Sequence, residues 1–265
     1  MFEPRLALAS LSGRSDAEWA RAGSEFAGAA FLGGIALDDP TRNAAREMVE
    51  RDREEFLPDD PIAFVDRQLA RLEDADLRVG FNVRAASLDP IRAVARVCAD
   101  RDAILEINAH CRQDEICRAG AGESLLRNPD RLREQVAAAV EAGEGADSEL
   151  AVSVKVRAEL PGVDLAEIAR LVADAGADAV HVDAMDSEGE VAEVASVADA
   201  TDLFVIANNG VRDAATVREY LAYGADAVSV GRPSDDPAVL RRVRSATDEW
   251  FQSEEREQEE PEVTS

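Results

Sequence analysis

The residues with the clearest chemical potential lie in one loop, within the stretch EINAHCRQDEICRAGAGESLLRNP at residues 106–129. An apolar strand pattern ends at Asn108, and His110, Cys111 and Arg112 follow it directly. Because basic neighbours favour the thiolate form of a cysteine, Cys111 is a candidate reactive thiol. The alternative is a small buried hydrophobic residue, which is the commonest role of a lone cysteine.

The other two cysteines are less suggestive. Cys117 shares the loop, and Cys98 lies in a helical pattern, where burial is the expected role. A metal site of Cys111, Cys117 and His110 is conceivable, but the spacing of the two cysteines matches no common zinc pattern, and we expect no metal. Three cysteines are also too few for a disulfide framework, so we expect a cytoplasmic protein.

Lys155 is the single lysine in a chain with 29 basic residues. It lies in SVKVR, a strand pattern otherwise built largely from valine. Lysine is a compact donor whose pKa shifts readily, whereas arginine is a planar fork, so one retained lysine indicates a functional role. The alternative is a lysine that extends its ammonium group from a strand end into water. His181, between two valines, is equally compatible with an interior polar role and with a satisfied core histidine.

Two glycine-containing loops suggest a different chemistry. Asn208, Asn209 and Gly210 follow one apolar strand pattern, and Gly231 with Arg232 follows the next. Backbone N–H groups in such loops bind anions, and an arginine fork matches phosphate oxygens. The two loops together predict a phosphate site, although the Asn-Asn-Gly loop alone would be equally compatible with a simple tight turn.

Apolar runs bounded by turn residues alternate with helical patterns along the whole chain. The expected strands are residues 6–10, 27–32, 77–83, 103–108, 150–156, 179–183, 203–208 and 227–231. The expected helices are residues 16–23, 61–73, 89–99, 129–142, 164–175, 188–198, 213–223 and 237–251, with a further helix over 39–55. Eight such units predict an α/β fold, a closed (β/α)8 TIM barrel. The alternative is an open doubly wound sheet, but no GxGxxG motif follows the first strand.

The composition of the chain limits the domain organisation and the partners that can be expected. We expect one barrel domain over residues 1–251 and a disordered acidic tail over 252–265. No apolar run of about 18 residues occurs, so no membrane partner is expected. The net charge of −26 and the near absence of lysine indicate a halophilic protein, with an ordinary acidic protein as the alternative. Screening in concentrated salt weakens any argument from charge against nucleic acids, although we expect no DNA partner.

Active sites of TIM barrels lie at the carboxyl ends of the strands. Polar residues and glycines occupy these positions in all but one of the eight expected units. They are Ser10, Asn82, Asn108, Cys111, Lys155, Asp183, Asn208, Asn209, Gly231 and Arg232.

The same residues resemble the tRNA-dihydrouridine synthase family. The stretch at 106–129 is similar to that family's Ile-Asn-x-Gly-Cys-Pro followed by Gly-x-Gly-x-x-Leu-Leu. ASLSGRSD, VGFNV, SVKVR, VIANNG and GADAVSVGR resemble further family segments in the same order. The likeness spans residues 5 to about 245 and is specific to FMN-dependent barrels. It is less specific to this family alone, because dihydroorotate dehydrogenases share much of the framework.

The resemblance implies a bound FMN, NAD(P)H as electron donor, and tRNA or a small pyrimidine as substrate. Hydride from the flavin would reach C6 of a uracil ring, and Cys111 would protonate C5 as general acid. Lys155 would stabilise the reduced flavin. The other implied flavin contacts are Ser10, Asn82, Asn208, Asn209, Gly210, Gly231 and Arg232. The implied substrate contacts are Asn108, His110, Arg112 and Asp183.

Three departures from the family pattern bear on the substrate. Arg112 replaces the proline of Cys-Pro, and Asp183-Ala184-Met185 replaces His-x-Arg. We also expect no folded segment after Phe251, where relatives carry a helical tRNA-binding domain. A dihydroorotate-dehydrogenase-like enzyme and a non-redox barrel that binds a phosphorylated small molecule therefore remain alternatives.

Overall fold

Eight parallel strands form a closed barrel in the computed structural model, which describes residues 1–144, 150–184 and 188–259. The strands are β1 (Leu6–Leu8), β2 (Ala29–Ala36), β3 (Arg78–Arg84), β4 (Ile104–Asn108), β5 (Ala151–Arg157), β6 (Ala179–Asp183), β7 (Phe204–Asn208) and β8 (Ala227–Val230). Each strand pairs with the next in the chain, and β8 pairs with β1 to close the ring. The predicted (β/α)8 TIM barrel is thereby confirmed.

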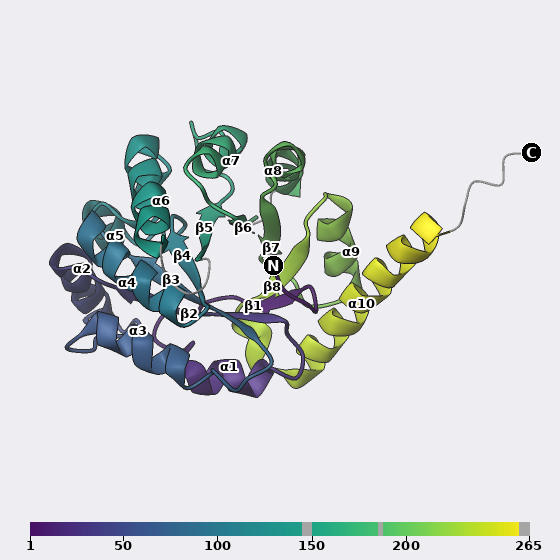
Figure 1. The fold of residues 1–265 in the computed structure, drawn as a ribbon, viewed down its shortest axis with the longest axis horizontal. Helices are drawn as coiled ribbons and strands as arrows, with labels where there is room; N and C mark the ends of the chain where they lie inside the picture. The colour runs from purple at the N-terminus through teal and green to yellow at the C-terminus, as the bar shows by residue number, and fades with distance from the viewer. Residues whose placement is uncertain (145–149, 185–187, 260–265) are drawn as a thin grey trace, which may run out of the picture.

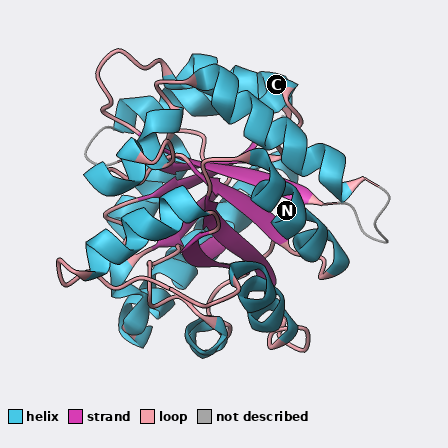
Figure 2. Cartoon of the chain, turned by 90° about the vertical axis from the view of Figure 1, so that its left-hand side faces the viewer, coloured by secondary structure: helices cyan, strands magenta, loops and turns pink. Residues whose placement is uncertain are grey.

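Helices surround the strands on the outside (Figures 1 and 2). They are α1 (Ala17–Gly23), α2 (Asp39–Val49), α3 (Pro61–Ala70), α4 (Leu88–Asp100), α5 (Asp114–Arg118), α6 (Pro129–Gly143), α7 (Leu165–Asp174), α8 (Glu188–Thr201), α9 (Ala214–Ala222) and α10 (Pro237–Glu259), with short 3-10 turns η1 (Gly122–Leu125) and η2 (Arg232–Asp235). The main apolar core lies between the helices and the outer face of the barrel. A smaller cluster, including Phe2, Phe31, Ile104 and Ile206, fills the interior, which explains why the strands are apolar on successive positions.

The largest departure from the sequence expectation lies between β2 and α3. The helix expected over residues 39–55 ends at Val49, and residues 51–60 run without regular structure to the N-cap of α3 at Asp60. Strand β2, expected to end at Leu32, continues to Ala36 through a bulge at Gly33 and Gly34. The acidic composition of 39–55 concealed the helix end, and the glycine pair beyond the expected end of the strand forms a bulge inside it.

The other departures are smaller. The loop after β4 contains the short helix α5 and the turn η1, neither of which was expected. Helix α10 continues to Glu259, so the expected tail begins as helix, and residues 260–265 lie outside the described part of the chain (Figure 1). The division into a barrel and a disordered tail stays a prediction. Within the described residues, no helix has the length and apolarity needed to cross a membrane.

Candidate functional site

A cavity of about 260 Å³ opens at the carboxyl ends of the strands, where the barrel fold places active sites. It gathers residues from the ends of several strands and the loops that follow them. Among its lining residues are many of those singled out in the sequence: Ser10, Asn108, His110, Cys111, Arg112, Asp183, Asn209 and Arg232. Asn82, Lys155 and Asn208 do not line the cavity and are buried. These residue roles stay predictions, but the fold brings most of them to one place.

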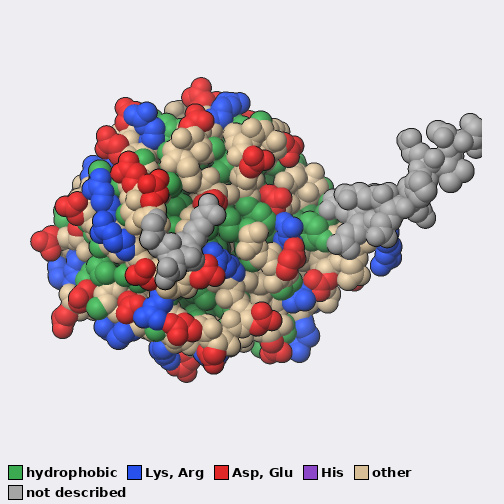
Figure 3. Space-filling model, viewed as in Figure 1, with side chains coloured by type: hydrophobic (Ala, Val, Ile, Leu, Met, Phe, Trp, Pro, Cys, Tyr) green, Lys and Arg blue, Asp and Glu red, His purple; other side chains and the backbone are tan. Residues whose placement is uncertain are grey.

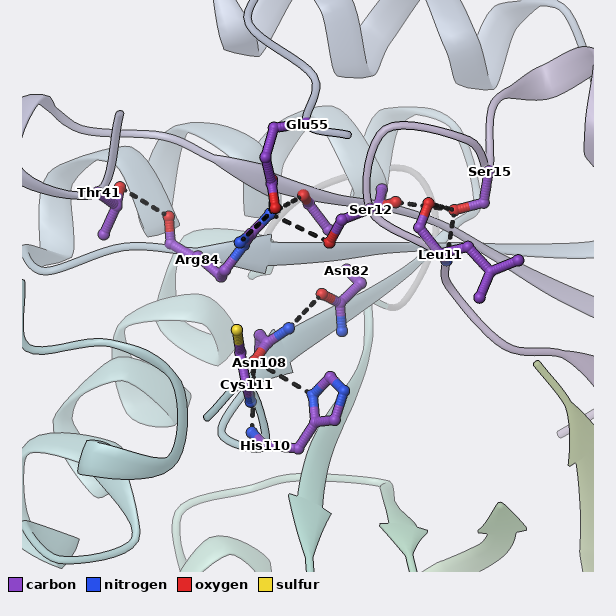
Figure 4. A network of polar contacts seen from close by, with 12 residues as sticks. Leu11, Ser12, Ser15, Thr41, Glu55, Asn82, Arg84, Asn108, His110 and Cys111 are labelled. Carbon is purple, nitrogen blue, oxygen red and sulfur yellow. Dashed lines mark hydrogen bonds and ion pairs between the residues drawn. The ribbon is translucent and has the colours of Figure 1, made fainter. Parts of the chain in front are cut away.

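The backbone around Cys111 is held by a chain of hydrogen bonds that begins inside the barrel (Figure 4). Asn108 Oδ1 accepts from the backbone N–H groups of Cys111 (3.0 Å) and His110 (3.3 Å). Asn108 Nδ2 donates to Asn82 Oδ1 (2.8 Å), and Asn82 Nδ2 donates to Glu106 Oε1 (2.7 Å). Because an ionised carboxylate only accepts, Glu106 sets the orientation of both amides and thereby the position of the thiol loop.

Asn82 therefore has a different task from the flavin contact that the resemblance implies. Its side chain is fully buried, and both ends of its amide are bonded to Glu106 and Asn108. Sequence reasoning also missed Glu106, although a carboxylate inside the apolar strand AILEIN was a signal that the position is special.

Glu106 lies at the centre of a buried polar network. His181 Nδ1 lies 2.7 Å from Glu106 Oε2, and His181 Nε2 lies 2.8 Å from Ser229 Oγ. Burial opposes ionisation of Glu106, but the hydrogen bond from His181, the positive charge of Lys155 and the hydrogen bond from Asn82 lower its pKa. Burial and the charge of Lys155 also lower the pKa of His181, which is neutral near pH 7 as a result. His181 lies inside the barrel, fully buried with both ring nitrogens bonded, and so fits both interpretations left open by the sequence.

Lys155 lies beneath the cavity and is only 2% exposed. Burial lowers its pKa, and the carboxylates of Glu106 and Asp183 oppose that effect. The ammonium group of Lys155 makes no hydrogen bond to a described residue, so its donors are available. Its charge also acts on His110. The pKa of His110 lies well below the ordinary value because of burial and because of the neighbouring groups Lys155, His181, Arg84 and Arg157.

Beside Cys111, the structure reveals a buried ion pair that the sequence did not suggest. Arg84, at the end of β3, pairs with Glu55 from the irregular segment 51–60, and their side chains are 0% and 1% exposed. Arg84 also donates to the carbonyl of Gly34 and to Ser12 Oγ (3.3 Å) (Figure 4). In the sequence, Arg84 could have been noticed as a charged residue at the end of an apolar strand. Glu55 gave no such signal, because it lies among many acidic residues.

The glycine pair in β2 leaves room for the Asn82 amide beside this ion pair. A Cβ on Gly34 would lie 2.7 Å from Asn82 Oδ1 and 3.5 Å from Arg84 Nε. Gly33 has a φ of +95°, which permits the bulge that shifts the register with β3. The bulge thus allows the guanidinium to lie against the β2 backbone.

The loops after β7 and β8 form the opposite side of the cavity and are open. Asn209 and Gly210 have φ values of +92° and +70°, and a Cβ on Gly231 would meet nothing within 4 Å. Arg232 lines the cavity and has no hydrogen-bond or ion-pair partner among the described residues. Asn208 is turned away, since its Nδ2 donates to the carbonyl of Ser229 (3.0 Å). An open glycine loop beside an unpaired arginine suits an anionic group such as phosphate.

The cavity is rich in arginine although the chain has a net charge of −26. Arg53, Arg112, Arg157 and Arg232 line it, against the carboxylates of Glu55 and Asp183. Elsewhere acidic and basic side chains alternate over the surface, as the face in Figure 3 shows. The local surplus of arginine in an acidic protein indicates an anionic ligand.

No group of three or more His, Cys, Asp and Glu side chains in the described ranges is arranged to hold a metal ion. Cys117 Sγ lies 3.5 Å from the carbonyl oxygen of Cys111, a contact from thiol to backbone. The acid–base groups that line the cavity include the Cys111 thiol, the His110 imidazole and the Asp183 carboxylate.

Fold and cavity together define a TIM-barrel enzyme with its site at the carboxyl ends of the strands. The dihydrouridine synthase family model matches residues 59–264, and the chain therefore belongs to that family of tRNA-modifying oxidoreductases.

Relatives agree with this assignment. The chain is 28% identical over 235 residues to tRNA-dihydrouridine synthase B of Proteus vulgaris, covering 83% of this chain and 71% of that protein. It is 26% identical over 238 residues to an uncharacterised protein of Methanocaldococcus jannaschii, covering 87% and 89% of the two chains. Among solved structures, dihydroorotate dehydrogenase of Eimeria tenella shares the fold, with a TM-score of 0.65, 16% identity, and coverage of 95% and 82%.

Proposed function

We propose that this protein is a flavin-dependent enzyme that reduces the C5–C6 bond of uridine in tRNA. The observation that carries the proposal is the arrangement of the cavity. The Cys111 loop, held by the buried Asn108–Asn82–Glu106 chain, and the open loops that suit phosphate line the same cavity, with the single lysine buried in the neighbouring strand β5. Membership in the dihydrouridine synthase family supports the same reaction class.

The residues on the open side fit FMN at its phosphate end. Asn209, Gly210, Gly231 and Arg232 would hold the phosphate, because a Cβ at Gly231 would meet nothing within 4 Å and the arginine has no partner among the described residues. Lys155, with its available ammonium donors, would lie under the negatively charged edge of the ring. When bound, FMN supplies the hydride to the substrate, with NAD(P)H as the electron donor.

The acid–base part of the reaction falls to Cys111. Its thiol would give a proton to C5 of the uracil ring, and the resulting thiolate would recover a proton from water. His110 is neutral near pH 7 because of its lowered pKa, so it would act as a hydrogen-bonding group and not as a cation beside the base. Arg112 and Arg157 would contact anionic parts of the substrate.

The test has two readouts. Purified protein should bind FMN, seen as flavin absorbance and quenched flavin fluorescence, and deletion of the gene should remove dihydrouridine from specific tRNA positions. Cys111→Ala should keep FMN but lose about 10²- to 10⁴-fold in reduction rate, because it removes the general acid. Cys117→Ala is the matched control. Unchanged dihydrouridine in the deletion strain, or unchanged turnover of Cys111→Ala, would contradict the proposal.

A small carboxylated pyrimidine is the second candidate substrate. The arginines in the cavity suit a free carboxylate, and the fold is shared with dihydroorotate dehydrogenase. Turnover of dihydroorotate by the flavin-loaded protein, together with normal dihydrouridine in the deletion strain, would favour this candidate.

A further inference from the structure

The Glu55–Arg84 pair has no role in the proposed reaction as described so far, yet it lies directly against the thiol. Figure 4 shows the sulfur of Cys111 directed toward the side chain of Arg84. Burial opposes the charge on Arg84, but Glu55 and then Cys111, through charge and hydrogen bonding, raise the pKa of the guanidinium. The guanidinium is therefore a permanent cation on the side toward which the sulfur points.

We propose that Arg84, held by Glu55, is a positioning residue that directs the thiol of Cys111 into the cavity and stabilises its thiolate. The inference rests on the proposed function in one respect: a general acid that gives up its proton must leave a thiolate behind. A fixed cation beside the sulfur lowers the cost of that charge.

Other charged groups also surround Cys111. The titratable and charged side chains nearest to it on the surrounding elements are those of Arg53, Glu55, Arg84, His110, Arg112 and Cys117. Asp183, Arg157 and Arg232 line the cavity with them. Arg53 and Arg112 are exposed, so water and salt screen their charges, whereas Arg84 is fully buried. Among these cations, we therefore expect Arg84 to have the largest effect on the sulfur.

Several features keep Arg84 in place. The carbonyl of Gly34 accepts a hydrogen bond from the guanidinium. The Glu55 backbone is fixed because Gly13, with a φ of +74°, passes close to it; a Cβ there would lie 2.6 Å from the nitrogen of Glu55. Phe56 packs against Phe64 with ring centroids 5.2 Å apart, which anchors the segment beyond Glu55. The position of the cation thus depends on contacts among β2, β3 and two loops.

The test measures alkylation of Cys111 by iodoacetamide, which attacks thiolates and needs neither flavin nor RNA. Burial raises the pKa of Cys98 to about 12, and burial with Glu123 raises that of Cys117 to about 11, so Cys111 should dominate the reaction. A Cys117→Ser background removes the remaining competitor and keeps a hydrogen-bond donor to the Cys111 carbonyl. Mass spectrometry assigns the modified cysteine, and a modified Cys98 would reveal unfolding.

In this background, Glu55→Gln/Arg84→Gln should slow alkylation at least about tenfold near pH 7 and move its pH profile upward by about one unit. Arg84→Lys should recover part of the rate, because it restores the charge. Glu55→Gln alone should speed alkylation, because the carboxylate no longer offsets the guanidinium. Arg112→Gln, which removes an exposed cation, should change the rate by less than about threefold.

Opposite signs for Glu55→Gln and the double variant support the inference. Parent-like rates and pH profiles in the double variant would overturn it; if that variant does not fold, parent-like behaviour of both Arg84→Lys and Glu55→Gln would do so. An equal slowing by Arg112→Gln would also overturn it, since the effect would then belong to the general charge of the cavity. Absence of tRNA reduction with these alkylation effects intact would instead remove the proposed function.

Discussion

The two sides of the barrel mouth are built on opposite principles. On the closed side, formed by Glu55, Arg84, Asn108 and Cys111, polar groups are bonded to one another and largely shielded from water. On the open side, formed by Asn209, Gly210, Gly231 and Arg232, backbone is exposed and the arginine lacks a partner. The closed side is bonded within itself except at Arg84 Nε, which is buried and has no hydrogen-bond partner among the described residues, whereas the open side has an unpaired arginine that a bound anion would satisfy.

This contrast separates positioning from binding. A proton donor must be held within a fraction of an ångström of its target, which requires a network of satisfied hydrogen bonds behind it. An anion site must instead leave its donors free, and its affinity comes from the partners that it lacks before binding. Substitutions on the closed side should therefore alter stability, and those on the open side should alter ligand affinity.

The largest expected effect comes from removing the buried cation. Arg84→Met leaves the Glu55 carboxylate buried without a partner, and the free energy of unfolding should fall by about 3–5 kcal/mol. Arg232→Met should change it by less than about 0.5 kcal/mol, because Arg232 is exposed and unpaired. Urea denaturation of both variants measures the difference. Equal losses would erase the distinction between the two sides.

A glycine pair sharpens the same comparison. Gly34→Ala would bring a Cβ within 2.7 Å of Asn82 Oδ1 and should cost about 1–3 kcal/mol of stability. Gly231→Ala would meet no atom within 4 Å, so its cost should be smaller and should come only from the backbone, whose ψ of −117° at a φ of −90° is unfavourable for an L residue. Thermal and urea unfolding give both values. A well-tolerated Gly34→Ala would mean that the β2 bulge can move away from Arg84.

On the open side, the expected effect is on affinity. Arg232→Ala should weaken FMN binding by about tenfold, because a charged hydrogen bond to phosphate contributes about 1.5–3 kcal/mol. Arg170→Ala removes another exposed arginine without a described partner, away from this cavity on α7, and should leave FMN affinity unchanged. Titration followed by flavin fluorescence measures both. Unaltered affinity in Arg232→Ala would place the phosphate elsewhere.

The smallest expected effect concerns the buried network behind the closed side. Burial and Lys155 lower the pKa of His181, so the folded protein binds fewer protons than the unfolded chain, whose histidines titrate near about 6.5. The stability that neutral His181 contributes is therefore fully present above about pH 6.5, and it falls by about 1 kcal/mol as the pH drops to about 5.5.

The measurement compares the free energy of unfolding at about pH 7.5 and pH 5.5 in the parent and in His181→Asn. The variant should lose less stability on acidification than the parent, although it starts from a lower value. The other histidine, His110, is present in both proteins and serves as the internal reference. An identical pH dependence would show that folding does not lower the pKa of His181 and would contradict this prediction.

Strands and helices with a periodic apolar pattern could be predicted from the sequence, because such patterns depend on neighbouring residues alone. Alternation of apolar runs with helical patterns predicted the barrel, and the carboxyl-end rule predicted a shared mouth for Ser10, Cys111, Asp183 and Arg232. The 39–55 segment failed because acidic composition carries no period that marks where a helix ends. Glu55 was missed for the same reason, since nothing local separates it from its acidic neighbours.

The sequence by itself determined the eightfold βα order, the thiol loop after β4 and the glycine loops after β7 and β8. Only the tertiary structure decided that Glu55 pairs with Arg84 beside Cys111, and that Glu106, Asn82 and Asn108 form one chain of hydrogen bonds. The physical reason is that secondary structure follows from local periodicity, whereas a buried polar partner is selected by the closure of the barrel. That closure brings together residues from different strands and loops, and desolvation there makes each unsatisfied group costly.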